Sequence, residues 1–234
     1  MKLGIMQPYF LPYVGYWQLM NAVDKYVVYD DVNYIKQGWI NRNRILCNGK
    51  PTYINLPIFG ASQNKLINDI TVNHDEKCKS KVLKTVEQSY KKAPFFSDVF
   101  PLIEEIMYFD ENNVALFLMN SFRVIGKFLD IQTELILSSE LEKDNNLRGE
   151  EKVLSICELL GATEYYNAIG GKELYSFDTF QEHGIQLNFL EAKITPYEQQ
   201  IDHFEPALSI LDVMMHNGAK RSREMLSEYE IKRL

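Results

Sequence analysis

The stretch from Leu3 to Leu46 constrains the fold of this 234-residue chain more than any other part of it. It opens with a short apolar run, Leu3 to Met6, that has the length of a buried strand. Apolar residues at helical spacing follow in Val14 to Ala22, and Tyr26 to Tyr29 is a second run of β-forming residues. A strand, a loop, a helix and a second strand within about 30 residues are typical of a βαβ unit, whose two strands are parallel.

Polar side chains follow both predicted strands. Ligands of parallel α/β sheets bind outside the carboxyl ends of the strands, and here these ends carry Gln7 and the pair Asp30-Asp31. The polar side chains that continue the stretch are Lys36, Asn41, Arg42, Asn43 and Arg44. A carboxylate at this place can act as a general base or hold a metal, and an arginine can clamp a phosphate or a carboxylate. The alternative is that Asp30-Asp31 begins a turn and that the arginines form solvated ion pairs.

The next part of the chain combines a hairpin with a block of helices. Asn48-Gly49 predicts a two-residue hairpin turn, because both residues tolerate positive φ. The predicted elements that follow are a short strand, Ile70–Val72, and three helices, Glu76–Tyr90, Phe96–Met107 and Val114–Phe128. We therefore expect residues 74–130 to form an all-helical insertion or subdomain in the middle of the chain.

Helices and strands alternate from Val114 onward. The predicted strands are Thr133–Leu137, Thr163–Asn167 and Ile185–Leu190. The predicted helices are Gly149–Leu160, Phe177–Glu182, Pro206–Met215 and Ser222 to the terminus. Such alternation is typical of an α/β fold with a mostly parallel sheet flanked by helices. The sequence therefore predicts a single α/β domain over residues 1–234, with the helical insertion inside it.

Composition and charge limit the class of protein. The net charge of −7 argues against broad nucleic-acid binding, and the chain has no apolar run of the length that a membrane-spanning helix needs. The N-terminus enters a strand directly, without the pattern of a secretion signal. Cys47, Cys78 and Cys157 are too widely spaced for a zinc site and do not indicate disulfides. We expect a cytoplasmic protein that acts on a small molecule, and the sequence does not specify its oligomeric state.

Two further motifs are candidates for binding or catalysis. Gly170-Gly171 follows a predicted strand, where it lets the backbone approach a ligand, and a tight turn is the alternative. Asp212 and His216 are four residues apart and share one face of a predicted helix. They form either an acid–base pair that reaches a cleft or a structural hydrogen bond.

The remaining candidates are predicted to bind substrate. Tyr9 and Tyr175 offer aromatic faces, which suit sugar and base rings, and Asn64 lies in a small polar loop. The chain has neither the spacing of a dedicated metal site nor the nucleophile elbow of a hydrolase. A Mg²⁺ ion carried in with a nucleotide is the one cofactor for which the sequence leaves room.

The chain resembles the WbqC-like protein family over nearly its whole length. The motifs that carry the resemblance are IMQPYFLPYVGYWQL, AVDKYVVYDDVNYIKQGWINRNRI, SQNKLI, YKKAPFF, LSSEL, YYNAIGGKELY and PALSILDVMMHN. Members of this family are typically encoded among genes for O-antigen and other surface-polysaccharide synthesis. They are described there as transferases that decorate sugars, and glycine transfer to an amino sugar is one suggestion. Many relatives have His-Gln-Pro where this chain has Met6-Gln7-Pro8, so the resemblance carries no catalytic histidine to this position.

The resemblance and the polar strand ends together favour a transferase. Its substrate would be a nucleotide-linked amino sugar of lipopolysaccharide (O-antigen) biosynthesis, which accepts an acyl or aminoacyl (glycyl) group on its nitrogen. In this hypothesis Asp30 or Asp31 is the general base, and Asn41 or Asn43 donates a hydrogen bond to the carbonyl oxygen. We expect the Asp31→Asn variant to lose turnover and to keep its fold.

Two other functions compete with this hypothesis. The opening strand, the loop that ends at Gly15 and the next helix are similar in layout to nucleotidylyltransferases, although the histidine-glycine-histidine pattern of those enzymes is missing. A non-catalytic scaffold in a polysaccharide-assembly complex would use the aromatic loop Tyr9 to Trp17 as an exposed contact patch. Release of pyrophosphate would indicate a nucleotidylyltransferase. Burial of the aromatic rings would argue against a scaffold.

Overall fold

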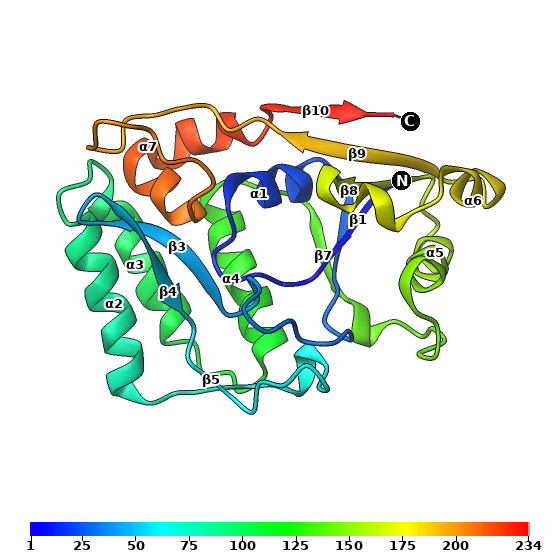
Figure 1. Ribbon diagram of the computed structural model, residues 1–234, viewed down its shortest axis with the longest axis horizontal. Helices are drawn as coiled ribbons and strands as arrows, with labels where there is room; N and C mark the ends of the chain where they lie inside the picture. Colours follow the sequence, from blue (N-terminus) through cyan, green and yellow to red (C-terminus); the bar gives the residue numbers. More distant parts are fainter. Residues whose placement is uncertain (234) are drawn as a thin grey trace.

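A six-stranded sheet forms the centre of the protein in the computed structural model, which describes residues 1–233 (Figure 1). The strands are β1 (Lys2–Met6), β2 (Lys25–Val28), β7 (Glu134–Leu137), β8 (Glu164–Ala168), β9 (Gln186–Ala192) and β10 (Tyr229–Lys232). Their order is β10-β9-β8-β1-β2-β7, and every neighbouring pair is parallel except β9 and β10. The predicted α/β class with a mostly parallel sheet is therefore confirmed, and so is the opening βαβ unit.

Helices cover both faces of the sheet. They are α1 (Val14–Asn21), α2 (Glu76–Tyr90), α3 (Phe96–Met107), α4 (Val114–Phe128), α5 (Gly149–Leu159), α6 (Phe177–Glu182) and α7 (Ile210–Met225). Three short 3-10 helices are η1 (Ile67–Asp69), η2 (Ser138–Glu140) and η3 (Ile169–Leu174). Within residues 1–233, no helix has the length and apolar character needed to cross a membrane.

The alternation of side chains along the central strands divides the hydrophobic core in two. Leu3, Ile5 and Val27 belong to one cluster, which also contains residues of α5 and α6. Tyr26 and Val28 belong to the other, which contains residues of α1, of α2 to α4 and of α7. In Figure 1, α5 and α6 accordingly lie at one end of the molecule, and α2 and α3 lie at the other. The sheet therefore has both faces buried, as parallel sheets require.

Two small antiparallel pairs lie outside the main sheet. β3 (Arg42–Cys47) and β4 (Lys50–Asn55) form a hairpin, and β5 (Ile58–Phe59) pairs with β6 (Thr71–Val72). The turn residues Asn48 and Gly49 have φ values of 50° and 75°, so the predicted hairpin turn is confirmed. The helices of residues 74–130 share one core cluster with α1 and α7. Their status as an insertion stays a prediction.

The C-terminal part of the chain differs from the prediction at two places. The predicted helix Pro206–Met215 begins only at Ile210, because Ala207 has a φ of 55° and the hydroxyl of Ser209 caps the helix by accepting the Leu211 N–H. The last predicted helix begins at Ser222 and is helical only to Met225, where helix α7 ends; its continuation toward the terminus is wrong, because the chain then forms β10 against β9. Alternating half-buried side chains of β10 pack on the core, which favours a strand over a helix.

Candidate functional site

The strand order reverses between β1 and β8. From β1 the chain passes through α1 to β2 on one side, whereas β8 lies on the other side of β1 and is entered from α5. The pairing of β1 with β8 ends at Gly4 and Tyr166. Beyond this point Met6 and Ala168, at the ends of the two strands, are not paired with each other. Crevices at such reversal points are the usual ligand sites of open parallel sheets.

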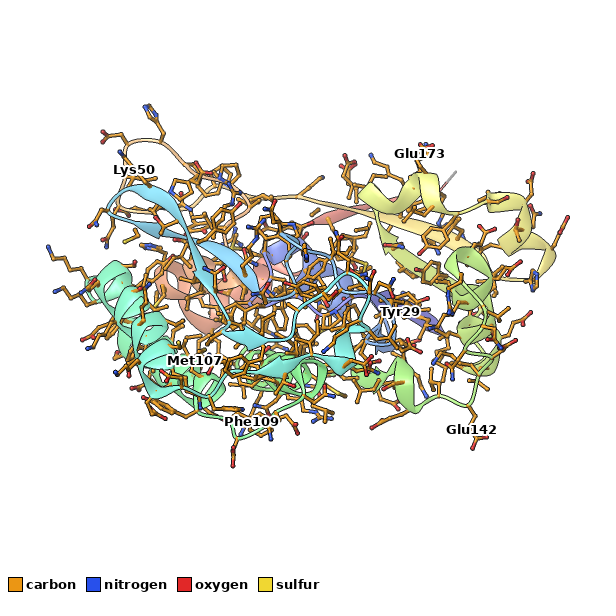
Figure 2. The ribbon with its side chains drawn as sticks, turned by 60° about the horizontal axis from the view of Figure 1, so that its bottom comes forward. Tyr29, Lys50, Met107, Phe109, Glu142 and Glu173 are labelled. Carbon is orange, nitrogen blue, oxygen red and sulfur yellow. The ribbon has the colours of Figure 1, made fainter. Side chains whose placement is uncertain are left out.

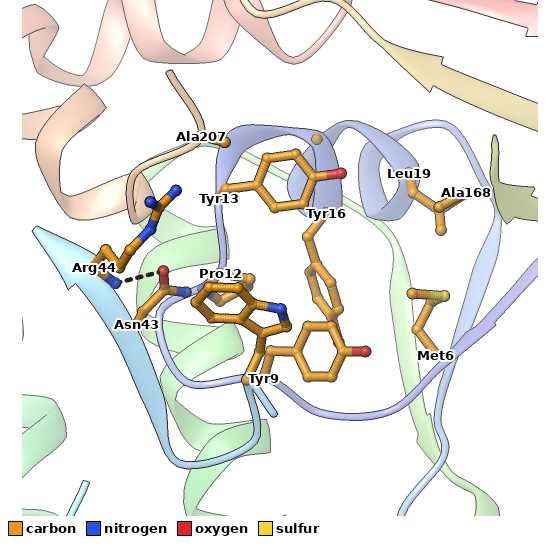
Figure 3. A pocket seen from close by; sticks show the side chains of 12 residues that line it. Met6, Tyr9, Pro12, Tyr13, Tyr16, Leu19, Asn43, Arg44, Ala168 and Ala207 are labelled. Carbon is orange, nitrogen blue, oxygen red and sulfur yellow. Dashed lines mark hydrogen bonds between the residues drawn. The ribbon is translucent and has the colours of Figure 1, made fainter. Parts of the chain in front are cut away.

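A largely aromatic cavity of about 300 Å³ lies at this crevice (Figure 3). Met6 and Ala168 line it from the strand ends. The rings and the polar side chains that complete its wall belong to Tyr9, Tyr13, Tyr16, Trp39, Asn43 and Arg44. We call this space the aromatic cavity. It combines ring faces with a few polar groups, which is the composition of small-molecule sites.

The loop that forms the floor of the aromatic cavity is held in a strained conformation. Leu11 has a φ of 44°, which is unusual for a residue with a branched side chain. Its carbonyl oxygen accepts hydrogen bonds from Asn43 Nδ2 at 2.9 Å and from Ser209 Oγ at 2.6 Å. Asn43 Nδ2 also donates to the carbonyl of Phe10 at 3.1 Å. Strained loops that are over-determined in this way are concentrated at functional sites.

The polar groups of the aromatic cavity are mostly donors. Burial raises the pKa values of Tyr9 and Tyr13 further above the usual value for tyrosine, which is itself far above neutral pH, so their hydroxyls are protonated. The Tyr16 hydroxyl donates to the carbonyl of Gln7 at 2.9 Å. The Nε atom of Arg44 is buried without a hydrogen-bond partner among residues 1–233, and its guanidinium approaches Glu205 at 3.8 Å. The cavity therefore presents hydroxyl and guanidinium donors to a ligand that carries oxygen acceptors.

The burial of the aromatic loop argues against the contact patch that the scaffold hypothesis requires. Phe10, Tyr16 and Trp17 are at most 3% exposed and belong to the core, while Tyr9 and Tyr13 face the aromatic cavity. The loop from Tyr9 to Trp17 therefore lines a pocket and does not offer an exposed surface of rings to another protein.

A second cavity, of about 410 Å³, lies at the carboxyl ends of β2 and β7. Asp31 lines it, and the Asp31 Oδ2 atom lies 2.8 Å from Lys143 Nζ and 3.0 Å from Lys152 Nζ. The side chains of the two lysines are 1% and 3% exposed. Burial favours a higher pKa for Asp31, but the two lysines outweigh it and hold the pKa of the carboxyl below its usual range. We call this space the cationic cavity.

Asp30 has a structural environment. Its side chain is buried, and it accepts hydrogen bonds from the Ser139 N–H at 2.9 Å and from Ser139 Oγ at 2.6 Å. A third donor, Asn68 Nδ2, lies at 3.4 Å. Asp30 thus ties the end of β2 to the end of β7. The contacts of both carboxylates favour positioning, and the role of general base stays a prediction for each.

The two cavities are neighbours on one edge of the sheet. Met6 lines the aromatic cavity and Tyr29 lines the cationic cavity, and the Tyr29 N–H donates to the Met6 carbonyl at 2.8 Å. In Figure 2, half-buried Tyr29 lies toward the middle of the view, whereas Glu142 and Glu173 lie near its outline. Gln7 directly follows the end of β1, and its role in binding stays a prediction.

Several predicted binding residues lie outside these cavities. Asn41 joins Tyr34 to the carbonyl of Leu56. The Arg42 guanidinium donates to carbonyls of residues 37–38 and lies 4.6 Å from the ring centroid of Tyr53. Lys36 and Asn64 are exposed on loops. Their predicted contacts with substrate find no support in the positions of these side chains and stay predictions.

The Gly-Gly motif lies just after β8, in η3. A Cβ atom on Gly171 would lie 3.2 Å from Asn167 Nδ2, so the glycine allows a close approach to that side chain. Gly170 is exposed with open space around it. Tyr175 is half-buried, and its hydroxyl lies 3.2 Å from that of Tyr165. The motif therefore has a packing role at the strand end, and a ligand role stays a prediction.

The Asp212 and His216 side chains occupy one face of α7 but are not joined by a hydrogen bond among residues 1–233. The Asp212 carboxylate accepts from the hydroxyls of Tyr90 at 2.7 Å and of Tyr197 at 2.6 Å and from Gln199 Nε2 at 2.9 Å. Burial lowers the pKa of His216, so its ring is neutral at pH 7. The acid–base role of the two residues stays a prediction.

Sequence analysis did not identify the basic residues of the cationic cavity. Arg148 and Lys152 line it, and Lys143 pairs with Asp31 behind it. One signal was present, because Lys152 lies on the same helix stripe as the buried Val153 and Ile156. A lysine beside such a stripe needs a buried partner, and this requirement marks it as a candidate.

Comparison with known proteins agrees with the resemblance of the sequence motifs. The family model of the WbqC-like protein family matches residues 7–224. A protein of Mycobacterium tuberculosis (strain ATCC 25618 / H37Rv), described as uncharacterized protein Rv1507c, is 28% identical over 223 residues, which are 94% of this chain and 95% of the relative. No solved structure matches the chain significantly. The matched residues include the linings of both cavities except for Met6, and the chain belongs to the WbqC-like protein family.

Proposed function

We propose that this protein is a transferase that modifies a nucleotide-linked amino sugar of bacterial surface-polysaccharide biosynthesis. The observation that carries the proposal is the aromatic cavity at the reversal point of the sheet, between β1 and β8. Its volume of about 300 Å³ suits one sugar or base ring, and its walls are ring faces with hydroxyl and guanidinium donors. The proposed substrate class is the one that the resemblance to the WbqC-like family implies.

The reaction in this proposal is acyl or aminoacyl transfer to the sugar nitrogen. The amine attacks the carbonyl carbon of an activated acyl group and the new C–N bond forms. The bond to the leaving group breaks, and the leaving group departs with the bonding electrons and takes up the proton that the amine loses. Asn41 and Asn43 were the expected donors to the carbonyl oxygen, but their amide groups donate to backbone carbonyls of the protein. The hydroxyls of Tyr9 and Tyr13, which line the aromatic cavity, are the better candidates for that role.

A ligand screen tests the proposal. The panel holds dTDP-, UDP- and GDP-amino sugars, nucleoside triphosphates with Mg²⁺, acyl-coenzyme A and aminoacyl-tRNA. A ligand that binds the folded state raises the melting temperature, and we expect the largest rise with a nucleotide-linked amino sugar. Mass spectrometry of that sugar after incubation with the acyl donors should then show an added acyl mass. A rise with a triphosphate and Mg²⁺ alone, with release of pyrophosphate, would instead identify a nucleotidyltransferase.

A pair of isosteric variants locates the binding. Tyr13→Phe removes a hydroxyl from the aromatic cavity, and Tyr53→Phe removes one from an exposed ring outside it. Both changes keep the ring and so should spare the fold. We expect Tyr13→Phe to weaken binding of the amino sugar severalfold and Tyr53→Phe to leave it unchanged. Equal affinities for the two variants would contradict the placement of the sugar in this cavity.

A further inference from the structure

We propose that the cationic cavity is an anion site that binds a phosphate or diphosphate group. This inference rests on the proposed function, because such a group links the sugar of a nucleotide sugar to its base. The groups that would hold the anion are Lys152 and Arg148, which line the cavity. The backbone N–H groups at the start of α5, beside Gly149, lie at the same wall and favour negative charge.

The hydrogen-bond donors of the lysines are not all used within the protein. An ammonium group has three N–H donors. Lys152 Nζ lies 3.0 Å from both Asp31 Oδ2 and the Asp31 carbonyl, which accounts for two of them. Lys143 Nζ contacts Asp31 Oδ2 and the Ser138 carbonyl, which again leaves one. Because Lys152 also lines the cavity, its remaining donor can reach a ligand there.

Arg148 is similarly available. Its Nη1 atom donates to the carbonyls of Asn145 and Leu147, and its side chain is exposed at the mouth of the cavity. Within residues 1–233, the Nε and Nη2 groups of Arg148 make no hydrogen bond, so the side of the guanidinium that matches two oxygens of a phosphate stays open.

The charges around the cavity favour an anion. Among the residues that line the cavity, two are cations, Arg148 and Lys152, and one is a carboxylate, Asp31. The oxygens of Asp30, which does not line the cavity, accept hydrogen bonds from Ser139 and Asn68. Glu150, on the first turn of α5, is engaged by the Ser176 N–H. A local cationic surplus in a chain with a net charge of −7 is the feature expected of a selective anion pocket. Asp31 acts in this account as a positioning residue, which fixes the two ammonium groups.

Calorimetric titration with inorganic pyrophosphate tests the anion site without any sugar chemistry. We expect the wild type to bind pyrophosphate with an affinity that falls as salt rises. Arg148→Gln, at an exposed position, should weaken this binding about tenfold or more, the effect of losing a charge-assisted hydrogen bond. The matched control is Arg123→Gln, because Arg123 lines a different cavity of about 400 Å³. Absence of pyrophosphate binding, or equal affinity for wild type and Arg148→Gln, would overturn the proposal.

Two more titrations separate this inference from the proposed function. A nucleoside diphosphate should bind more tightly than pyrophosphate if the anion belongs to a nucleotide, and the nucleoside alone should bind weakly. Pyrophosphate binding that is sensitive to Arg148→Gln, without binding of any nucleotide-linked amino sugar, would support the anion site and contradict the function. If the Arg148→Gln variant bound a nucleotide-linked amino sugar with the same affinity as the wild type, the result would contradict the anion site but not the proposed function.

Discussion

Asp31 connects the stability of the protein to the geometry of its candidate site. It is the carboxylate that neutralises two buried ammonium groups, at 2.8 and 3.0 Å. Removing one member of a buried ion pair is strongly destabilising, because the remaining charge stays buried without compensation. The contacts therefore do not agree with the expectation that Asp31→Asn spares the fold.

We predict that Asp31→Asn lowers the free energy of unfolding by about 3 kcal/mol at pH 7. The pKa of Asp31 is lowered in the folded protein. The stabilisation is therefore complete above the unfolded pKa, near 4, and is lost as the pH falls through the folded pKa. Urea denaturation from pH 7 to pH 3 should show wild type and variant converging at the acid end.

The control for this prediction is Glu134→Gln, which breaks the exposed pair between Lys25 and Glu134. Exposed pairs contribute little, so the change should stay within about 0.5 kcal/mol. If Asp31→Asn were as stable as Glu134→Gln at pH 7, the pairing of Asp31 with the two lysines would not stabilise the fold.

His216 gives a second prediction for a single residue. Its pKa is lowered by burial, against the attraction of Asp212 and Glu198. A histidine with a lowered folded pKa is neutral in the fold, and its contribution to stability is lost as the pH falls below the unfolded value of about 6.5. His216→Gln should therefore lose less stability than the wild type between pH 7 and pH 5. The same loss in both proteins, measured by thermal unfolding, would show that His216 does not titrate in this way.

Helix α7 contains a break that only glycine fits. Gly218 has φ 66° and ψ −174°, and an added Cβ would lie 2.6 Å from the Phe95 ring. The Met215 carbonyl accepts a hydrogen bond from the Phe95 N–H instead of continuing a regular helix. The break therefore locks α7 against the start of α3.

We predict that Gly218→Ala lowers the free energy of unfolding by about 2 kcal/mol or more, because it combines a strained conformation with a clash. The matched control is Gly126→Ala in α4, where the nearest atom to the added Cβ is 3.9 Å away. Alanine favours helix by about 0.5–1 kcal/mol relative to glycine, so this control should be neutral or stabilising. Similar losses for the two variants would contradict the account of the break.

The loop beneath the aromatic cavity depends on one amide. Asn43→Asp turns a buried donor to two carbonyls into a carboxylate that repels them. We expect a loss of at least about 2 kcal/mol in the free energy of unfolding, and weaker binding of the amino sugar by the folded fraction. Asn112→Asp, on an exposed loop outside both cavities, is the control and should change neither quantity. Unchanged stability of Asn43→Asp would mean that other contacts hold the loop.

The elements that could be predicted from the sequence are those with a local signal. α2 and α4 have the predicted bounds, because an amphipathic pattern begins after a capping Asp75 or Asn113. The last element could not be predicted in this way. Residues 229–232 form a strand because β9 presents an open edge to them, and this edge is visible only once the sheet is assembled.

At the scale of the whole molecule, the parts of the site that could be predicted are again those with a local signal in the sequence. The polar ends of β1 and β2 could be found from the sequence, because ligands of parallel sheets bind at these ends. The pairing of Asp31 with Lys152, 121 residues further along the chain, could not, because it depends on β7 lying beside β2. For the same reason, the meeting of Arg44 with the rings of Tyr9 and Tyr13 emerged only from the folded chain.

The most direct test of the central claim is hydrogen exchange of the protein with and without the nucleotide-linked amino sugar that the screen selects. Binding across the two cavities should slow exchange in residues 7–17, around Arg44 and in residues 139–152, and should leave residues 76–107 unchanged. Protection confined to other parts of the chain, such as the cavity beside His216, would contradict the claim that the carboxyl edge of the sheet is the substrate site.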